Sequence, residues 1–374
     1  MYRFCERWLF LWLLSQLLSP GISAQKNDST APDARLSNIF SFSSGIHHGF
    51  IFAHSPLVEN TKGANPTGIE VSFGWQRSDA TTWDLCNCFP RKGLLIAYYD
   101  YDTKILGKGI IAGYFLEPNY KLGKRNFFSI KGAAGLGYLT NPFDSIKNPT
   151  NQSYSAAVSG YLLVGVGLWF KLSDHWWLNG SVNYQHVSNA GLSQPNKGIN
   201  WPTAGIAIEY QKNPRPYYSG IRSKERSWKN NSPRWDISIF GIAKKGSDEQ
   251  GNRKRLPLLG FSLQGSKQVG RINMLTFGAE IFNDEALRVQ LRRDSINASA
   301  VKAGVTFGHE FLLGKFLFSQ RLGVYIFDQT PYYDRIYHRW GIHYMMNRHW
   351  GAGFHLLAHR HVADFIDIRL SYSL

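Results

Sequence analysis

The chain of 374 residues is predicted to be an all-β protein with two antiparallel eight-stranded transmembrane β-barrels in tandem, and three observations support this prediction. Beyond residue 45, apolar and polar residues alternate with a period of two rather than 3.6. Aromatic residues make up 15% of the chain and charged residues only 18%, a composition that excludes a disordered protein. Beyond residue 25, no apolar run reaches the roughly 18 residues that a spanning helix needs, which excludes a helical membrane bundle.

The first 24 residues have the three parts of a secretory signal peptide. Arg3 and Arg7 form a charged start, residues 8–18 are mostly apolar, and 22–24 is a small-residue cleavage site. The apolar run is too short for a membrane anchor. We therefore expect a cleaved signal at 1–24, followed by a lead-in at 25–44.

The segment 175–187 illustrates the alternation. Val182 and Tyr184 lie on one face of the expected strand, and Asn179 and Asn183 lie on the other. In a membrane barrel the apolar face meets lipid and the polar face lines the lumen. A soluble β-sandwich gives the same alternation, but the export signal, the aromatic residues at strand ends and the absence of a disulfide framework favour the membrane barrel.

Two series of eight expected strands are separated by a basic, polar and proline-bearing linker at 213–233. The first barrel is assigned to 45–212 and the second to 234–374. The expected strands are 46–54, 67–77, 93–101, 109–117, 126–140, 156–171, 175–187 and 203–212, then 235–244, 257–266, 272–282, 301–311, 316–327, 336–346, 350–359 and 362–373.

Two short landmarks recur in the same order in both series, which indicates an internal duplication. Residues 122–124 and 313–315 both read Leu-Gly-Lys before the fifth strand, and 175–176 and 349–350 both read His-Trp at the start of the seventh. Between the landmarks the first copy is 17 residues longer, and 145–155 has the character of an inserted loop.

One sixteen-stranded barrel fits the strand count as well as two eight-stranded barrels do. An even number of strands returns each copy to the side on which it began, so the linker lies on the periplasmic side. Periplasmic turns of membrane barrels are usually short, so a long connection there favours two separate barrels.

After cleavage of the signal, Cys86 and Cys88 are the remaining cysteines. One intervening residue makes a strained disulfide, and two thiolates do not complete a tetrahedral zinc site. We expect a loop pair that oxidises outside the cytoplasm, rather than a redox or metal centre.

The most specific stretch of the chain is 184–200, which reads YQHVSNAGLSQPNKGIN. His186 and Ser188 share a strand face, and that face continues the apolar one of Val182 and Tyr184. The seventh strand runs outward, so the pair lies at the outer interface. A His beside a Ser serves as general base for an alkoxide nucleophile, here facing the acyl chains and ester bonds of an outer-leaflet lipid. An interfacial His followed by a turn-forming Ser-Asn is the structural alternative.

The run His-x-Ser-Asn-Ala-Gly-x-x-x-Pro-Asn-x-Gly resembles the signature of the PagL-type lipid A deacylases, also grouped as acyloxyacyl hydrolase-like proteins. The resemblance covers about residues 45–212 and is strongest over 184–202. It implies an eight-stranded outer-membrane barrel that hydrolyses an acyl ester on the lipid A of lipopolysaccharide and needs no cofactor.

The resemblance also implies roles for individual residues. His186 is the general base, Ser188 the nucleophile, Asn189 a candidate oxyanion donor, and Asn196 a support of the loop that places the third member. The family pattern has Glu where this sequence has Asn200. An amide orients the imidazole but does not neutralise the imidazolium, and replacing the acid of such a triad by its amide can cost about 10⁴ in rate.

Another carboxylate is the alternative third member. Asp100, Asp102 and Asp144 lie at outward strand ends or in loops and are candidates. Asp174 lies at the opposite end of the seventh strand, and Glu209 lies on the lumen face well down the eighth.

The second copy lacks the motif. Counted from the His-Trp landmark, His186 is 11 residues on and His359 is 10 on, and this odd shift turns His355 and His359 to the lumen. A metal site of His355, His359 and Asp364 is conceivable, but the four-residue spacing separates the two His by roughly 13 Å on a strand. We expect a degenerate, non-catalytic barrel.

The net charge of +16 is a weak guide to the partner. Nucleic acid is not expected, because no nucleic-acid-binding motif is present. Arg and Lys at the outer interface would bind the phosphates of lipid A. The clearest basic cluster lies in the linker, where it is either solvated or faces anionic inner-leaflet lipids. It consists of Arg215, Arg222, Lys224, Arg226 and Lys229.

These observations predict a secreted outer-membrane protein of a Gram-negative bacterium whose first barrel is a serine esterase acting on lipid A. The alternatives are a non-catalytic barrel, structural or a narrow channel, with a decayed site, and a surface binding protein. Asn200 is the feature that favours a decayed site.

Overall fold

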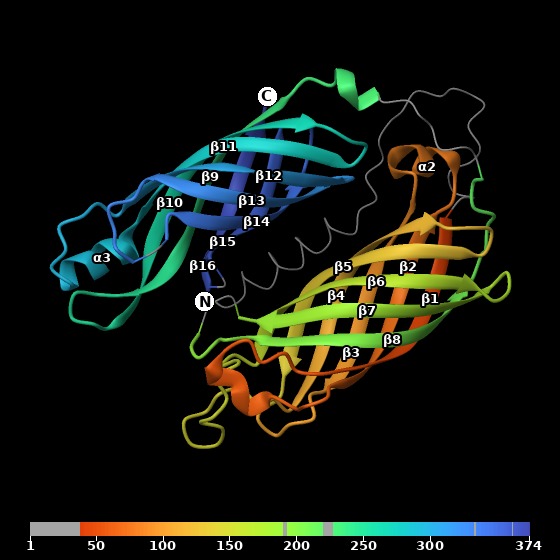
Figure 1. The fold of residues 1–374 in the computed structure, drawn as a ribbon, viewed down its shortest axis with the longest axis horizontal. Helices are drawn as coiled ribbons and strands as arrows, with labels where there is room; N and C mark the ends of the chain where they lie inside the picture. The colour runs from red at the N-terminus through yellow and green to blue at the C-terminus, as the bar shows by residue number, and fades with distance from the viewer. Residues whose placement is uncertain (1–37, 190–192, 220–226, 333, 361) are drawn as a thin grey trace, which may run out of the picture. The chain divides into compact units, whose positions relative to one another are not determined.

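The computed structural model describes residues 38–189, 193–219, 227–332, 334–360 and 362–374. These residues form two closed antiparallel barrels of eight strands each, β1–β8 and β9–β16 (Figure 1). The alternative of a single sixteen-stranded barrel is therefore wrong. The predicted signal peptide at 1–24 and the first part of the predicted lead-in, 25–37, lie outside the described residues.

Barrel one closes where β1 pairs with β8. The connections 50–66, 101–107, 140–157 and 189–198 lie together at one end of this up-and-down barrel, which we call the loop end; the other is the linker end. The strands are β1 (Asn38–Gly49), β2 (Thr67–Arg77), β3 (Phe89–Asp100), β4 (Lys108–Lys121), β5 (Asn126–Leu139), β6 (Val158–Lys171), β7 (Trp176–Ser188) and β8 (Ile199–Gln211), with η2 (Pro56–Thr61) and α2 (Ala80–Cys86) in connections.

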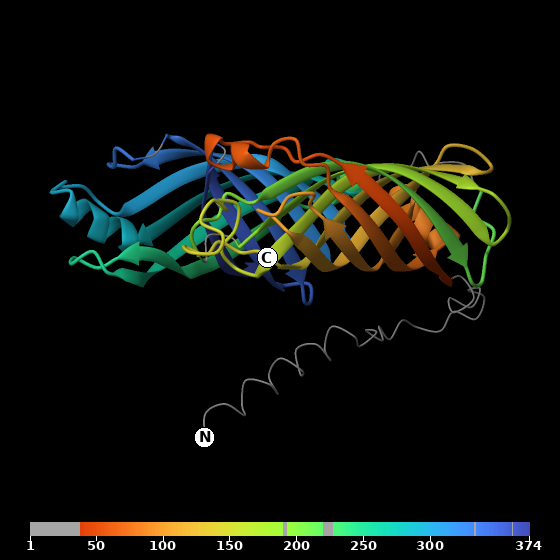
Figure 2. The same cartoon turned by 90° about the horizontal axis from the view of Figure 1, so that it is seen from below.

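Barrel two closes where β16 pairs with β9, and its strands cross the barrel at a slant, as those of barrel one do (Figure 2). None of the described helices is long and apolar enough to cross a membrane. The elements are η3 (Ser227–Asn230), β9 (Arg234–Ser247), β10 (Arg253–Gln268), β11 (Asn273–Asp284), α3 (Glu285–Arg293), β12 (Val301–Leu313), β13 (Phe316–Phe327), β14 (Ile336–Met345), β15 (Trp350–His359) and β16 (Val362–Ser373).

The strands place apolar side chains on the outer surface, as their alternation predicts, and place polar side chains inside together with apolar and aromatic clusters. On β7, Val182 and Tyr184 are exposed on the outer surface, whereas Asn179 and Asn183 are buried in the lumen. This arrangement inverts that of a soluble barrel, whose apolar side chains face the core, and it is typical of a barrel surrounded by lipid.

Charged side chains form ion pairs in the lumen of barrel one, beside clusters of buried apolar and aromatic side chains. Arg91 is buried between Glu117 and Glu209, with its Nη2 2.9 Å from Glu117 Oε2, and Lys131 Nζ lies 2.5 Å from Glu70 Oε1. The cavity beside them measures about 20 Å³, enough for roughly one water molecule.

Barrel two repeats this design with different residues. Arg339 is fully buried between Glu280, at 3.0 Å, and Asp367, at 2.5 Å. The lumen cavity of this barrel measures about 30 Å³. In both barrels, these buried charges are paired with charges of opposite sign, and the ion pairs connect different strands across the lumen.

The landmarks of the predicted duplication occupy equivalent places. His175 precedes β7, and its Nδ1–H donates to the carbonyl of Gln211 at the end of β8 over 2.8 Å. His349 precedes β15, and its Nδ1–H donates to the carbonyl of Ser373 at the end of β16 over 2.9 Å. Each ring also stacks on a tyrosine of the last strand, with centroids 5.4 and 5.5 Å apart. We call this arrangement the histidine clamp.

The first strand begins earlier than predicted. β1 starts at Asn38 rather than at 46, so part of the predicted lead-in belongs to the barrel. The reason is that Phe42 and Ser43 already alternate between the outer surface and the lumen, a pattern that continues into the predicted strand.

The eighth strand also begins earlier, at Ile199 rather than at 203. Asn200 is therefore a strand residue, held by the ladder with β7, and not a loop residue.

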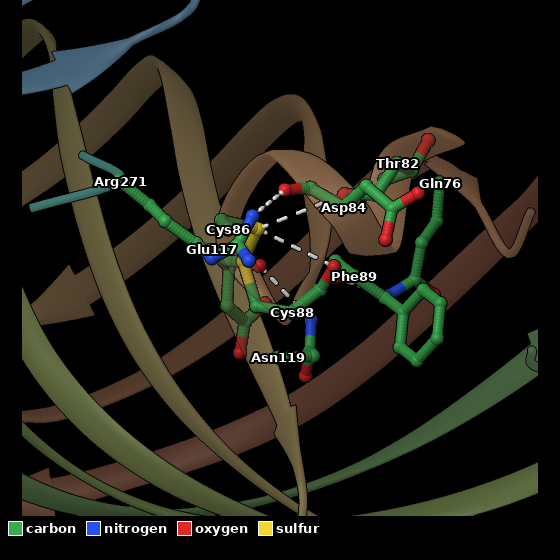
Figure 3. The surroundings of a disulfide bond; sticks show 9 residues. All are labelled: Gln76, Thr82, Asp84, Cys86, Cys88, Phe89, Glu117, Asn119 and Arg271. Carbon is green, nitrogen blue, oxygen red and sulfur yellow. Dashed lines mark hydrogen bonds between the residues drawn. A yellow bond between two sulfur atoms is a disulfide. The ribbon is translucent and has the colours of Figure 1, made fainter. Parts of the chain in front are cut away.

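The β2–β3 turn contains α2, which the sequence pattern does not predict. Asp79 caps this helix by accepting the Thr82 N–H over 2.8 Å, and the helix ends at Asn87 in the left-handed region. Cys86, the last residue of the helix, forms a disulfide with Cys88 (Figure 3), as expected for an oxidised pair.

The start of the linker packs against barrel one. Tyr217 contacts the rings of Phe89 and Phe127 at 5.0 and 4.8 Å between centroids, and its hydroxyl donates to Gln76 Oε1 over 2.8 Å. The linker thus helps to close the linker end. Of its predicted basic cluster, Arg222, Lys224 and Arg226 lie outside the described residues.

Candidate active site

The predicted motif lies at the loop end of barrel one, where β7 ends and β8 begins. Ser188 is the last residue of β7, and His186 lies two positions before it. Both follow the outward-facing series of Val182 and Tyr184, as the alternation predicts. Both side chains are partly exposed, at the loop-end edge of the apolar outer surface.

Three side chains form a continuous chain of hydrogen bonds. The Ser188 hydroxyl donates to His186 Nε2 over 2.9 Å, and the His186 Nδ1–H donates to Asn200 Oδ1 over 2.7 Å. In this tautomer the Nε2 lone pair faces the serine, which is what a general base requires. Asn200 is buried, with 7% of its surface exposed.

The ladder between β7 and β8 brings Asn200 to His186. The two residues are direct partners across the ladder. Side chains at such positions lie on the same face of the sheet, with Cβ atoms about 4.5–5.5 Å apart. Backbone pairing between β7 and β8 therefore positions Asn200, the third residue of the hydrogen-bond chain.

The structure adds a fourth residue, His54, which sequence analysis missed. The Asn200 Nδ2–H donates to His54 Nδ1 over 2.8 Å. His54 lies in the 50–66 connection, which runs beside β8 because the Phe52 N–H donates to the Asn200 carbonyl over 2.8 Å. His54 and Asn200 are 146 residues apart in the chain, so no local pattern marks their contact.

Asn189 and Asn196 hold the β7–β8 loop. The Asn189 N–H donates to Asn196 Oδ1 over 2.9 Å, and Asn189 Nδ2 donates to the carbonyl and the hydroxyl of Ser193, each over 3.0 Å. These bonds engage the N–H groups of Asn189 in the loop, so its position fits loop support better than oxyanion binding. Residues 190–192 of the motif lie outside the described residues.

Gly198 shows why the motif ends in glycine. Its φ is +78°, in the left-handed region, and a Cβ there would lie 2.7 Å from His186 Cε1. A side chain at this position would strain the backbone and displace the imidazole.

The 140–157 connection, which contains the predicted inserted loop, packs against the motif. The Gly198 N–H donates to the Ser153 carbonyl over 2.7 Å, and the Lys197 N–H donates to the Gln152 carbonyl over 3.0 Å. The insertion therefore braces the loop that carries Gly198 beside His186.

The other carboxylates considered as third member have partners elsewhere. Asp100 lies 3.7 Å from Lys108 Nζ, and Asp102 accepts the Asn65 N–H over 3.1 Å. Asp144 accepts two backbone N–H groups of its own turn, which hold the pKa of its carboxyl below the ordinary value. Asn200 occupies the position at His186 Nδ1 that such a carboxylate would need.

His355 and His359 face the lumen of barrel two, as predicted. Arg321 donates to His355 Nδ1 over 2.9 Å, His359 Nε2 lies 3.1 Å from a tyrosine hydroxyl, and Asp364 pairs with Lys244 at 2.6 Å. These partners engage the residues of the conceivable metal site. No group of three His, Cys, Asp or Glu that could hold a metal ion occurs in the part of the chain that the structure describes.

Comparisons with known families match both barrels. The family described as lipid A 3-O-deacylase (PagL) matches residues 67–209, and the family described as acyloxyacyl hydrolase, C-terminal domain, matches residues 233–374. Together the two matches span most of the chain. No curated protein matches it.

A search of solved structures finds several proteins that are similar to part of this chain. The crystal structure of the outer membrane enzyme PagL is 15% identical and aligns with 44% of this chain and 97% of its own, with a TM-score of 0.33. Neisserial surface protein A (NspA) is 11% identical over 46% and 96% of the two chains, with a TM-score of 0.33. The N-terminal β-barrel domain of Pseudomonas aeruginosa OprF is 13% identical over 46% and 96%, with a TM-score of 0.27.

Proposed function

Because the chain belongs to the PagL family of lipid A 3-O-deacylases, we propose that its first barrel is an outer-membrane serine esterase that removes an acyl chain from lipid A. The hydrogen-bond chain from Ser188 through His186 to Asn200, on the outward face at the loop end, is the observation that carries the proposal. A soluble substrate would not require a nucleophile on the apolar outer surface.

The surface of barrel one supports a place in the outer membrane of a Gram-negative bacterium. Exposed aromatic side chains occur near both ends of the barrel, with Tyr98, Tyr138 and Tyr184 near the loop end and Trp75 and Trp176 near the linker end. Two such girdles with an apolar band between them are typical of a barrel that crosses a bilayer. With the linker end in the periplasm, Ser188 lies in the outer leaflet, where lipid A resides.

The loop end also offers cationic groups for the substrate. Lys147 and Lys197 are exposed in the two loops that pack together beside the site. Lipid A carries phosphates, which bind ammonium groups through charge-assisted hydrogen bonds. Its acyl chains would lie along the outer surface below Ser188.

The proposed reaction proceeds in two stages. The Ser188 oxygen attacks the acyl carbonyl carbon as its proton passes to His186 Nε2, and His186 then returns the proton to the departing sugar oxygen. The first stage produces an acyl-enzyme on Ser188 and a free hydroxyl on lipid A. Water, deprotonated by His186, attacks the acyl-enzyme, and the fatty acid leaves with regeneration of the serine.

Asn200 has a limited role in this reaction. Its Oδ1 accepts the Nδ1–H and so orients the ring, but a neutral amide does not stabilise the imidazolium as a carboxylate does. We therefore expect a slower enzyme than one with a carboxylate at this position.

A channel function is less well supported. The lumen cavities of about 20 and 30 Å³ leave space for only a few water molecules, and buried ion pairs cross both lumens.

The experiment is mass spectrometry of lipid A from cells that express the full chain. Lipid A from cells with the wild-type protein should lack one acyl chain, and lipid A from cells with Ser188→Ala should keep all of its acyl chains. Ser44→Ala, which changes a partly exposed serine on the outward face of β1, is the matched control and should retain the wild-type activity. The esterase proposal fails if wild type leaves lipid A intact or if Ser188→Ala deacylates it as fast.

A further inference from the structure

The amide of Asn200 has two distinct orientations, whereas a carboxylate at this position would look the same in both. A carboxylate accepts hydrogen bonds at both oxygens, whereas an amide accepts at Oδ1 and donates at Nδ2. Only the orientation with Oδ1 toward His186 places the imidazole proton on Nδ1 and leaves Nε2 free for Ser188. With the amide reversed, Nε2 would carry the proton and the base would be lost.

His54 occupies the other end of the amide. Its Nδ1 accepts the Asn200 Nδ2–H over 2.8 Å, so the amide donates to His54 and accepts from His186. Because the two ends of an amide have opposite roles, the partner at one end determines what the other end offers.

We propose that His54 is a positioning residue that fixes the orientation of the Asn200 amide and thereby selects the tautomer of His186 that can deprotonate Ser188. This proposal rests on the proposed esterase function and deepens it. It also supplies a reason why a chain with Asn at the acid position can retain a working base: the second histidine provides the directional information that a carboxylate would not need.

The fold holds His54 in place from both sides. Two residues before it, the Phe52 N–H donates to the carbonyl of Asn200 itself. Directly after it, Ser55 caps η2 by accepting the Leu57 N–H, and η2 anchors the connection through the buried Val58. His54 is thus attached to the same strand residue through both backbone and side chain, which is the geometry of a preorganised support.

His54 is exposed and lies in a connection, so its replacement should leave the barrel intact. His54→Leu removes the acceptor. We expect kcat for lipid A deacylation in mixed micelles to fall about three- to tenfold, the equivalent of one neutral hydrogen bond. The apparent KM should stay unchanged, because the side chain of His54 acts through Asn200.

Two further variants separate positioning from mere structural support. His54→Asp presents an acceptor that cannot donate, at the same distance from the backbone, and should restore kcat to within about twofold of wild type. In an Asn200→Asp background both ends of residue 200 accept, so His54→Leu should cost less than about twofold. An equal loss in both backgrounds would mean that His54 acts without regard to the amide orientation.

The decisive measurement does not depend on activity. Nitrogen-15 NMR of labelled histidines in the full chain reports the protonated ring nitrogen of His186, whose signals are assigned by their loss in His186→Gln. Wild type and His54→Asp should carry the proton on Nδ1, and His54→Leu should show the Nε2–H tautomer as well.

An unchanged tautomer in His54→Leu overturns the proposal, whatever happens to the rate. Absence of deacylation by wild type would refute the esterase function, and the NMR result would still decide the role of His54.

Discussion

The two barrels share a scaffold and differ at one end. Each has eight strands, a lumen crossed by buried ion pairs and a histidine clamp on its last strand. In barrel one, β7 continues to Ser188, and the connection 189–198 leads to β8. In barrel two, β15 ends at His359, and only residues 360–361 precede β16.

The two barrels therefore share a scaffold, and the proposed site of barrel one is built at its loop end. Counted from the His-Trp landmark, Arg360 of barrel two stands where barrel one has His186. Arg360 lies in the short turn and pairs with Asp334 at 2.5 Å. A β-bulge between Leu357 and Ala358 also shifts the ladder just before this turn. Barrel two therefore lacks both the strand extension and the loop on which the site of barrel one is built.

The first prediction tests whether barrel one alone deacylates lipid A. His186→Gln should lower the rate at least about 10³-fold, because the general base is lost. Arg360→Gln, at the matching position of barrel two, should leave the rate unchanged. Mass spectrometry of lipid A after incubation with each purified full-length variant checks both. Substantial activity in His186→Gln would mean that the chemistry occurs elsewhere.

The identity of residue 200 gives the next largest effect. Asn200→Asp should raise kcat about tenfold or more, since a carboxylate stabilises the imidazolium that forms in both stages. Asn297→Asp, an exposed asparagine of barrel two, controls for the added negative charge and should change nothing. A lower kcat in Asn200→Asp would argue against Asn200 as the third member.

Two glycines with similar backbone angles sharpen the comparison further. Gly198 and Gly314 have φ of +78° and +71°, but an added Cβ would meet His186 at the first and nothing within 4 Å at the second. Both alanine variants should lose about 1–2 kcal/mol of stability from backbone strain. Only Gly198→Ala should also lower kcat, by about tenfold, as displacement of a catalytic group predicts. Equal rates in the two variants would show that contact with His186 is unimportant.

The smallest effects concern the shared scaffold. His175→Ala and His349→Ala should each destabilise their own barrel by about 1 kcal/mol, the value of one hydrogen bond. Urea unfolding of the full chain in detergent, followed by proteolysis at sites in each barrel, measures the two barrels separately. A change in both barrels from either variant would mean that they do not unfold independently.

The sequence predicted the parts of this protein that depend on local pattern. Period-two alternation gave the sixteen strands and their outward faces, because each strand residue points to one side or the other regardless of the rest of the chain. The spacing of His186 and Ser188 on one strand placed them on the same outward face for the same reason. The repeated landmarks predicted two copies, and His175 and His349 each directly precede the seventh strand of their barrel, as expected.

The tertiary structure decided what depends on partners distant in the chain. Two closed sheets form instead of one because β1 pairs with β8, and the local sequence of β1 does not identify that partner. The cross-strand pairing of His186 with Asn200 depends on where β8 begins, a boundary that its local pattern predicted incorrectly. The contact of His54 with Asn200 arises only when barrel closure brings the end of β1 beside β8, because hydrogen bonds between distant segments leave no periodic trace in the sequence.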